Sequence, residues 1–464
     1  MIFTGRDKGP RMIVGHVTEN SVKIWGRGDA DHPVMFVEAR DSHGDLFEEK
    51  VLLSDENAHT GVAELQHLQA DEDYQVEVSF GATAESKKEE RVYRTGGQVE
   101  TFPEPDSDEP FTVVVGSCNF HGFGPFRNNN RATRRRAEIA RDADIVLHTG
   151  DQIYADKAPL SFTLGEFREA YLSGWEDPGT REVLKSQANY MIPSDHEIVN
   201  GFALDGKLTR FQRLLLWARG QSGGSEREQY QELTSNALKA YSEFQQSHSP
   251  KPHQTDGHYY TFSHGRHQFF CMDNLLQRHN ENGVMISEQQ RDALFGWLTE
   301  HRDQPKFVVT GSPFVTEMKE TEEKWYSPEF SHQRDEIIDF LAREKLDNVM
   351  FLAGDVHASC HSQMNIKTPD GESLTIHELV ASPVNGTIMR GREKFVGERR
   401  GVTPGGTEYQ VNLDEKSFLG PGKLFKTTNS NVMKMSIEGD EIQYEFHRTR
   451  HSDDQPARSG SFRI

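Results

Sequence analysis

Residues 348–360 read NVMFLAGDVHASC, in which an apolar run ends in Gly-Asp and a histidine follows two positions after the aspartate. Such an apolar run is typical of a strand that is buried on both faces, as in a sheet covered by helices. Residues 143–156, ADIVLHTGDQIYAD, repeat the pattern with a tyrosine three positions after the aspartate. Because ligands bind beyond the carboxyl ends of strands in open α/β sheets, the two stretches predict one common site there.

The same kind of apolar strand recurs along residues 111–464 and alternates with amphipathic helices. One helix is expected at residues 287–301, opened by a capping box of Ser287 and Gln290, and a second at residues 334–345. Strands are expected at residues 111–118, 144–151, 267–274, 306–313, 348–355 and 376–383. Apolar strands with helices between them imply sheets covered on their faces, and therefore an α/β domain.

Residues 1–104 follow a different pattern, because their short strands alternate apolar and polar positions between turn residues. This pattern is typical of an all-β sandwich of the immunoglobulin or fibronectin kind, with Trp25 expected in its core. The stretch PEPDSDEP, residues 103–110, combines prolines with acidic residues and is typical of a linker. The sequence therefore predicts two domains, at residues 1–104 and 111–464.

The composition narrows the possible classes of function. The 464 residues carry a formal net charge of −21, which disfavours nonspecific binding to nucleic acid. No apolar run approaches the roughly 18 to 20 residues of a membrane span. No secretory signal is visible, so we expect a cytoplasmic protein, or a periplasmic or secreted one if a signal was removed. Three thinly spread cysteines argue against a disulfide framework, and the oligomeric state is left open.

Side chains of the types that bind metals follow four segments of the chain. A single aspartate at a strand end is more often a turn residue or a helix cap, but the whole set favours a metal site. Carboxylates, a phenolate and imidazoles suit hard or borderline cations, whereas a thiolate requires a metal that tolerates sulfur. This mixture of ligand types indicates two metal ions that differ in their preferred ligands and share one carboxylate. The members of the set are Cys118, Asp151, Tyr154, Asp195, His196, Asn200, Asp355 and His357.

The motifs GSC, GDQIYAD, DHEIVN, MDN and AGDVHAS, in this order behind a β-sandwich, resemble those of the PhoD-type alkaline phosphatases of the metallophosphoesterase superfamily. The resemblance covers nearly the whole chain. It implies a metallophosphoesterase fold, with sheets flanked by helices, and a dinuclear metal site. It also implies hydrolysis of a small-molecule phosphate ester, a monoester or a diester, by metal-bound hydroxide.

The resemblance also implies a role for each matching residue. A ferric ion would be held by Cys118, Asp151, Tyr154 and His357. A second ion, calcium in the family, would be held by Asp151, Asp195, Asn200 and Asp355, with Zn²⁺, Mn²⁺ and Mg²⁺ as alternatives. Asp151, shared by both ions, and His196, which would stabilise or protonate the leaving oxygen, are the predicted catalytic residues.

Three positions depart from the family pattern. Ser194 stands where the family usually has an aspartate, and Leu275 stands at the place of an arginine, so that Arg278 becomes the nearby candidate for binding the phosphate. The stretch VVTGSPF lacks the histidine of purple acid phosphatases, and Ser312 is the polar side chain at that strand end. These departures leave room for another oxyanion ester, such as a sulfate ester. A binding or scaffold protein with a degenerate metal site is a further alternative.

Residues 203–230 combine an apolar stretch that contains Trp217 with a Gly/Ser-rich segment. Such a segment can form a lid or rim over the site, or a peripheral helix and its loop. The sequence supports both interpretations equally.

Overall fold

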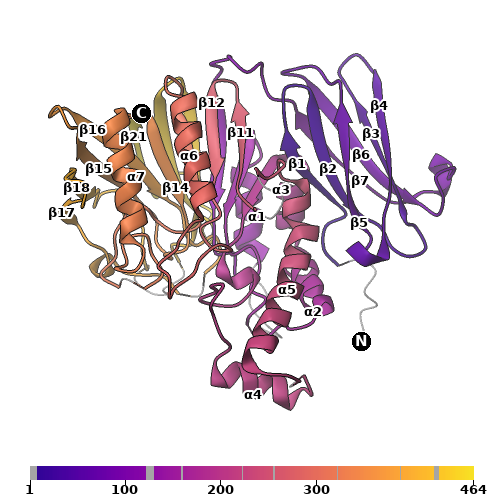
Figure 1. Ribbon diagram of the computed structural model, residues 1–464. Coiled ribbons are helices and arrows are strands. Elements are labelled where there is room, and N and C mark those ends of the chain that lie inside the picture. Colours follow the sequence, from indigo (N-terminus) through magenta and orange to yellow (C-terminus); the bar gives the residue numbers. More distant parts are fainter. Residues whose placement is uncertain are drawn as a thin grey trace.

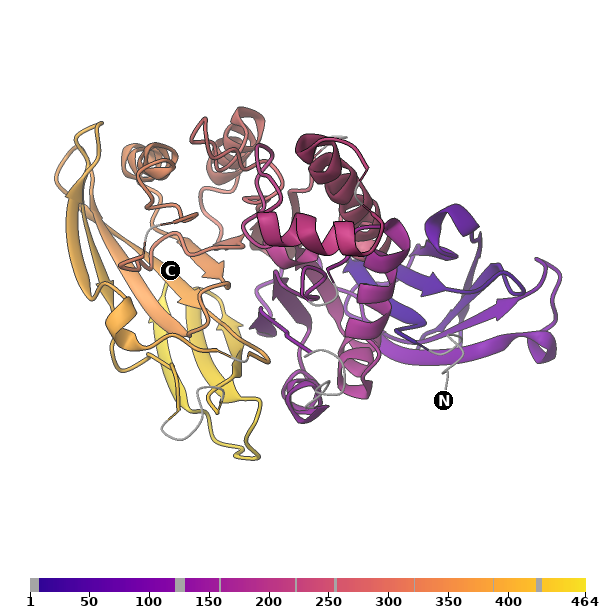
Figure 2. The ribbon, with the colours of Figure 1, turned by 90° about the horizontal axis from the view of Figure 1, so that it is seen from below.

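The computed structural model describes residues 8–121, 130–157, 160–221, 223–253, 257–320, 322–386, 388–422 and 428–464. Their strands form four sheets, and the all-β part formed by the N-terminal residues lies beside a larger part that contains all seven α-helices of the described residues (Figure 1 and Figure 2). Within these ranges, no helix is long and apolar enough to cross a membrane.

Two antiparallel sheets form the N-terminal sandwich. The strand order is β1-β2-β5 in the first sheet and β4-β3-β6-β7 in the second. Val22, Ile24, Val37 and Val76 are among the buried side chains of the core. The strands are β1 (Met12–Val17), β2 (Ser21–Arg27), β3 (Val34–Arg40), β4 (Leu46–Leu52), β5 (Thr60–Gln66), β6 (Asp73–Gly81) and β7 (Val92–Glu100).

Trp25 corrects one expectation about this sandwich. The side chain is fully buried, but it belongs to the cluster of buried side chains that includes Phe244 and Trp175 of the larger part. Its indole N–H donates to the backbone oxygen of Glu243 over 2.8 Å. Because successive strand residues point to opposite faces, Trp25 lies on the outer face of its sheet while Ile24 lies in the core. The outer face of β2 thus packs against the rest of the molecule.

Two large mixed sheets form the rest of the fold. One has the strand order β10-β9-β8-β19-β20-β21 and the other β11-β12-β13-β14-β16-β15-β18-β17. They share one cluster of buried apolar side chains, in which Tyr190 and Phe262 stack at 3.7 Å between ring centroids. The strands are β8 (Phe111–Gly116), β9 (Ile145–Thr149), β10 (Ala188–Ile192), β11 (Tyr260–His264), β12 (His267–Cys271), β13 (Lys306–Thr310), β14 (Val349–Ala353), β15 (Cys360–Lys367), β16 (Ser373–Val380), β17 (Glu398–Val402), β18 (Glu408–Leu413), β19 (Asn431–Glu438), β20 (Glu441–Arg448) and β21 (Arg458–Arg463).

The strands that carry the quoted motifs are parallel and central. In one sheet β8 and β10 flank β9, and in the other β13 and β16 flank β14, all in parallel register. Every residue of β9 and β14 is buried, because both faces of each sheet are covered. The carboxyl ends of β8, β9, β10 and β14 therefore lead into the loops that carry the predicted ligands.

Helices cover the outer faces of both sheets. α6 (Glu288–Glu300) and α7 (Ser331–Glu344) pack on the eight-stranded sheet through one cluster of buried side chains. α1 (Asn130–Ile139) and α3 (Pro178–Ser186) pack on the six-stranded sheet. α2 (Leu164–Gly174) and α5 (Glu226–Phe244) share a cluster of buried side chains with the sandwich, and α4 (Arg210–Ala218) projects at one end of the molecule (Figure 1).

The start of α6 departs in part from the expected capping box. Ser287 accepts the backbone N–H of Gln290 over 3.2 Å, as predicted. The side chain of Gln290 points elsewhere, where its amide accepts from the backbone N–H of Asp273 and donates to the backbone oxygen of the same residue, both over 2.8 Å. Gln290 therefore fixes the loop that follows β12.

Candidate metal centre

The candidate ligands meet where strands of the two sheets end. Cys118 follows β8, Asp151 follows β9 and Asp355 follows β14, each two residues after the end of the strand. The close approach of these loops requires a glycine at Gly354, because a Cβ atom there would lie 2.4 Å from Ser117 Oγ and 2.6 Å from Thr149 Oγ1. The two sheets thus converge on one small region.

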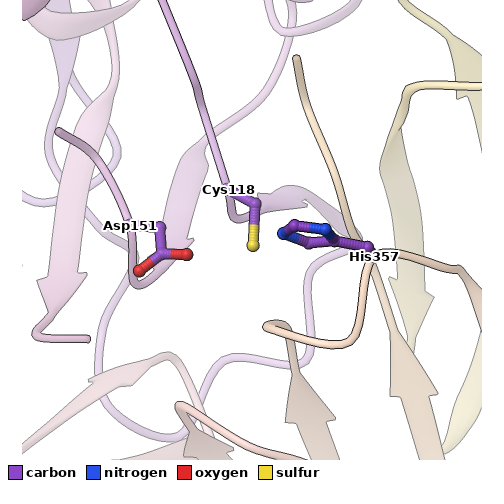
Figure 3. A group of neighbouring side chains, drawn as sticks. All are labelled: Cys118, Asp151 and His357. Atoms are coloured by element: carbon purple, nitrogen blue, oxygen red, sulfur yellow. The ribbon is translucent and has the colours of Figure 1, made fainter. Parts of the chain in front are cut away.

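Two clusters of possible ligand atoms occur in this region among the described residues. Cys118, Asp151 and His357 each offer one atom within 4.8 Å of the others, and Figure 3 shows the sulfur of Cys118 between the Asp151 carboxylate and the His357 ring. Asp151, Asp195 and His196 form the second cluster by the same criterion. Asp151 belongs to both clusters, which is the arrangement that a shared carboxylate requires.

The backbone at the strand ends has an unusual conformation. Cys118, Asp151, Asp355 and His357 have φ angles of 55°, 56°, 69° and 52°, in the left-handed region. They are four of the eleven non-glycine residues with positive φ in the described ranges. A non-glycine side chain in this region costs roughly 1 kcal/mol or more, so the surrounding fold must enforce it, and such strain gathers at functional sites.

The electrostatics of the site fit the binding of cations. Burial, together with the nearby Asp195 and Asp355 carboxylates, raises the pKa of Asp151 to about 6, although His196 opposes the shift. Burial and the carboxylates of Asp151 and Asp355 also raise the pKa of the Cys118 thiol. Asp151 Oδ1 is buried and has no hydrogen-bond partner among the described residues. A cluster of buried anionic donors with an unpaired oxygen is the environment that a bound cation stabilises.

Tyr154 lies against the shared carboxylate. Its hydroxyl donates to Asp151 Oδ2 over 3.2 Å, and its ring packs at 4.3 Å from the His196 ring between centroids. Burial, and then the charges of Asp151 and Cys118, raise the pKa of the Tyr154 phenol. The loop after β9 therefore supplies both a carboxylate and a phenol to the first cluster.

His196 is oriented by an aspartate that the sequence analysis did not single out. His196 and Asp195 lie in the short 3-10 helix Asp195–Glu197 that follows β10. The Nδ1 atom of His196 is 2.8 Å from Asp156 Oδ1, and Asp156 Oδ2 accepts the backbone N–H of Asn200 over 3.2 Å. Burial lowers the pKa of His196, but Asp151, Asp195 and Asp156 outweigh it and raise the pKa to about 10. Asn200 itself is exposed.

Glu197 is a second residue that the sequence analysis missed. It is fully buried, and its carboxylate accepts the backbone N–H groups of Asp151, Gln152 and Ser194 over 3.2, 2.5 and 3.0 Å. It therefore ties the loop after β9 to the loop after β10. The spacing of Ser194 and Glu197, three residues apart, is a sequence signal for the contact with the Ser194 N–H alone, and no pattern marks the contacts with Asp151 and Gln152.

Lys324 is a third residue that the sequence analysis missed, and it places a positive charge at the site. Its ammonium group donates to Asp355 Oδ2, and the side chain is 16% exposed. Burial raises the pKa of Asp355, but the Lys324 charge and hydrogen bond outweigh it and hold that pKa below its usual value. No pattern identified Lys324, because it lies in the long connection between β13 and α7 rather than at a strand end.

The two candidate substrate-binding residues, Arg278 and Ser312, both make polar contacts with other residues of the protein. Arg278 is buried, donates to the backbone oxygen of Phe202 and lies 3.6 Å from Glu323. Ser312 Oγ accepts from Asn274 over 3.1 Å. Leu275, at the place of the family arginine, is buried in an apolar cluster.

Comparisons with known proteins agree with this architecture. Residues 111–420 match the family described as PhoD-like phosphatase. The solved structure described as PhoD is similar over 100% of this chain and 90% of its own, with a TM-score of 0.68 and 16% identity. Purple acid phosphatase PPD1 from yellow lupin (Lupinus luteus) seeds is similar over 98% of this chain and 74% of its own, with a TM-score of 0.62 and 12% identity. A search of curated proteins finds no match.

The two structural neighbours share the fold, and their low identities carry no argument about activity. They confirm the predicted α/β fold, with its sheets flanked by helices and its all-β N-terminal part. The family match covers more than half of the residues, and it carries the assignment of function. The chain therefore belongs to the PhoD-like phosphatase family and is a metal-dependent phosphoric ester hydrolase.

Proposed function

We propose that the chain hydrolyses small phosphate esters, monoesters or diesters, at a dinuclear metal centre in which Asp151 is the shared carboxylate. The observation that carries this proposal is the place of Asp151 in both ligand clusters. In the same proposal, residues 111–464 form the catalytic domain and residues 1–104 form a sandwich domain that packs against it through Trp25.

The donor chemistry supports two ions of different character. Cys118, Asp151, Tyr154 and His357 would hold the ferric ion, because a thiol, a phenol and an imidazole accompany the carboxylate. Asp151, Asp195, Asn200 and Asp355 would hold the second ion, for which oxygen donors favour calcium, with Mg²⁺, Mn²⁺ or Zn²⁺ as alternatives. When bound, such a pair of cations makes a water molecule nucleophilic near neutral pH and neutralises charge on the phosphoryl group.

His196 is positioned to move a proton. Because its Nδ1 atom faces Asp156, that nitrogen carries the hydrogen of the 2.8 Å contact and the ring is held in one orientation. The Nε2 atom of the protonated ring then carries the hydrogen that can pass to the leaving oxygen of the ester. Asp156 acts through His196 and is therefore a positioning residue.

Lys324 is the side chain that we assign to the phosphoryl oxygens. Arg278 is committed to Phe202 and Leu275 is apolar, so neither supplies a free cation. Lys324 lies on Asp355 and retains some exposure, which allows its flexible side chain to reach a bound anion.

The test combines metal analysis with a substrate panel. Purified protein is analysed for metals, then assayed on a chromogenic phosphomonoester, a phosphodiester and a sulfate ester before and after treatment with a chelator. We expect turnover of at least one phosphate ester, loss of activity on chelation and recovery when metals are restored. Turnover of the sulfate ester alone would contradict the assigned substrate class. Full activity in a metal-free protein would contradict the dinuclear centre.

A further inference from the structure

Helix α4 and the turn before it expose an unusual amount of apolar surface. Four of the eight exposed large apolar side chains of the described residues lie within this one segment. They are Leu204, Phe211, Leu214 and Trp217, which are 55%, 67%, 57% and 67% exposed. A concentration of this kind marks an interaction surface, whereas isolated exposed apolar residues are ordinary.

One side of α4 packs against the rest of the protein, and the other side is exposed. Leu216 is fully buried in the cluster that contains Tyr230 and Leu233 of α5. Thr209 caps the first turn by accepting the backbone N–H of Gln212 over 3.2 Å. Because each residue advances about 100° around a helix, Phe211 and Leu214 lie roughly 140° and 160° from Leu216, and Trp217 lies about 100° from it, between the buried and the outer side. The helix is therefore formed and held independently of whatever contacts its outer side.

The outer side of α4 is also basic. The segment 203–221 contains four basic residues and one acidic residue, although the whole chain has a net charge of −21. Arg213 pairs with Glu226 at 3.4 Å, and Arg219 pairs with Glu166. Lys207 and Arg210 are exposed and make no ion pair within the described ranges. Around the helix Arg210 lies between Trp217 and Leu214, whereas Arg213 lies between Trp217 and the buried Leu216.

We infer that α4 docks on an anionic lipid surface. An aromatic and aliphatic face interleaved with arginines is the composition of helices that lie in the headgroup region, where apolar side chains insert and basic groups meet lipid phosphates. A second copy of the chain fits less well, because a two-fold contact through α4 would bring the arginines of both copies together.

The helix lies close to the candidate metal centre along the chain. Residues 198–209 connect the 3-10 helix that carries Asp195 and His196 to the start of α4. This connection is tied down where the Leu204 N–H donates to the backbone oxygen of Arg278 over 2.8 Å. The docking helix and the candidate metal centre are therefore joined by a short connection that is fixed within the fold. The inference does not depend on the proposed ester, since lipid binding is measured without turnover.

Trp217 provides a built-in probe of this surface. It is 67% exposed, whereas Trp25, Trp175, Trp297 and Trp325 are at most 6% exposed. A change in tryptophan emission on mixing with vesicles therefore reports on Trp217. The experiment adds vesicles of phosphatidylcholine, with or without about one third phosphatidylglycerol, to the full chain and measures emission, quenching by brominated acyl chains and flotation.

We expect a blue shift, quenching and co-flotation with the anionic vesicles, and at least tenfold weaker binding, about 1.4 kcal/mol, to neutral vesicles. The double variant Phe211→Ser with Trp217→Ser should lose flotation, and Lys207→Glu with Arg210→Glu should lose the preference for anionic lipid. Leu52→Ser is the matched control, because Leu52 is 77% exposed in the distant strand β4, and it should float as wild type does. Asp151→Ala should also float, which separates lipid binding from hydrolysis.

Several results would overturn the inference. Wild-type protein that floats with neither vesicle excludes lipid docking, and equal binding to neutral and anionic vesicles excludes the role of the basic residues. Light scattering measures the oligomeric state and tests the alternative that a second copy of the chain covers α4. If wild type is a dimer that Phe211→Ser with Trp217→Ser makes monomeric, and vesicles do not shift the emission, a second copy covers α4 instead.

Discussion

The two ligand clusters share Asp151 but are built in different ways. Cys118, Asp151 and His357 sit at the ends of central parallel strands, where two sheets and a required glycine leave little room for movement. Asp195 and His196 lie on a 3-10 helix within a longer loop, where the Glu197 carboxylate accepts from the Ser194 N–H and the Asp156 carboxylate contacts His196 Nδ1. The comparison indicates that the first cluster depends on the strand framework, whereas the second depends on a few buried carboxylates.

Removing the shared residue should have the largest effect. Asp151→Ala deletes the carboxylate common to both clusters, so we expect hydrolysis to fall to the rate measured without enzyme. The measurement is kcat/KM on the best ester from the substrate panel, with circular dichroism as a check on folding. Near-normal activity in this variant would show that the two clusters do not act as one centre.

His196→Ala should have the next largest effect. Loss of the proton donor should lower kcat by roughly 10²- to 10⁴-fold, while the metal content stays at the wild-type value. Asp156→Asn should lower kcat less, because the imidazole remains but loses the partner that orients it. A leaving group that needs no protonation should restore much of the rate in both variants. If it does not, His196 has a structural role instead.

Lys324→Met tests the cation that pairs with Asp355. We expect KM for the ester and the inhibition constant of orthophosphate to rise about tenfold, because one charge-assisted contact with the anion is lost. Lys324→Arg should retain most of the affinity. The competing interpretation is that Lys324 only holds Asp355, in which case phosphate affinity would stay constant and metal content would fall.

Asn200→Ala should have the smallest effect of the series. Asn200 is exposed, and the carboxylates would carry most of the binding of the second ion. We expect a several-fold weaker response to added second metal and little change in kcat at saturating metal, measured by titrating the metal-depleted protein. A complete loss of activity at saturating metal would show that the loop-borne cluster is as rigid as the first.

The strands that carry the candidate ligands could be predicted, because local sequence patterns indicate them. The apolar run in NVMFLAGDVHASC is β14, and His357 after it belongs to the first ligand cluster, because strand ends determine where side chains converge. Asp355 belongs to neither cluster, although its charge acts on Cys118 and Asp151. The family match confirms the class of enzyme. Cys118 and Asp151 were found by the same reasoning.

The supporting residues could not be predicted, because their roles depend on tertiary contacts. Glu197 and Lys324 reach the site from a 3-10 helix and a long connection, and no periodicity marks them. Trp25 was wrongly expected in the sandwich core, because alternation alone does not tell that the outer face of a sheet is covered by another part of the chain.

The count of metals bound per chain tests the central claim most directly. Elemental analysis of wild type, Cys118→Ser, Asp195→Ala and Asp151→Ala would be combined with visible spectra of the same samples. A dinuclear centre with a shared Asp151 predicts two metals in wild type with charge-transfer absorption from ferric thiolate and phenolate, loss of the thiolate part of that absorption in Cys118→Ser, and loss of the second metal alone in Asp195→Ala. It predicts that Asp151→Ala loses affinity for both. An Asp151→Ala protein that keeps both metals, or a colourless, iron-free wild type with full activity, would contradict it.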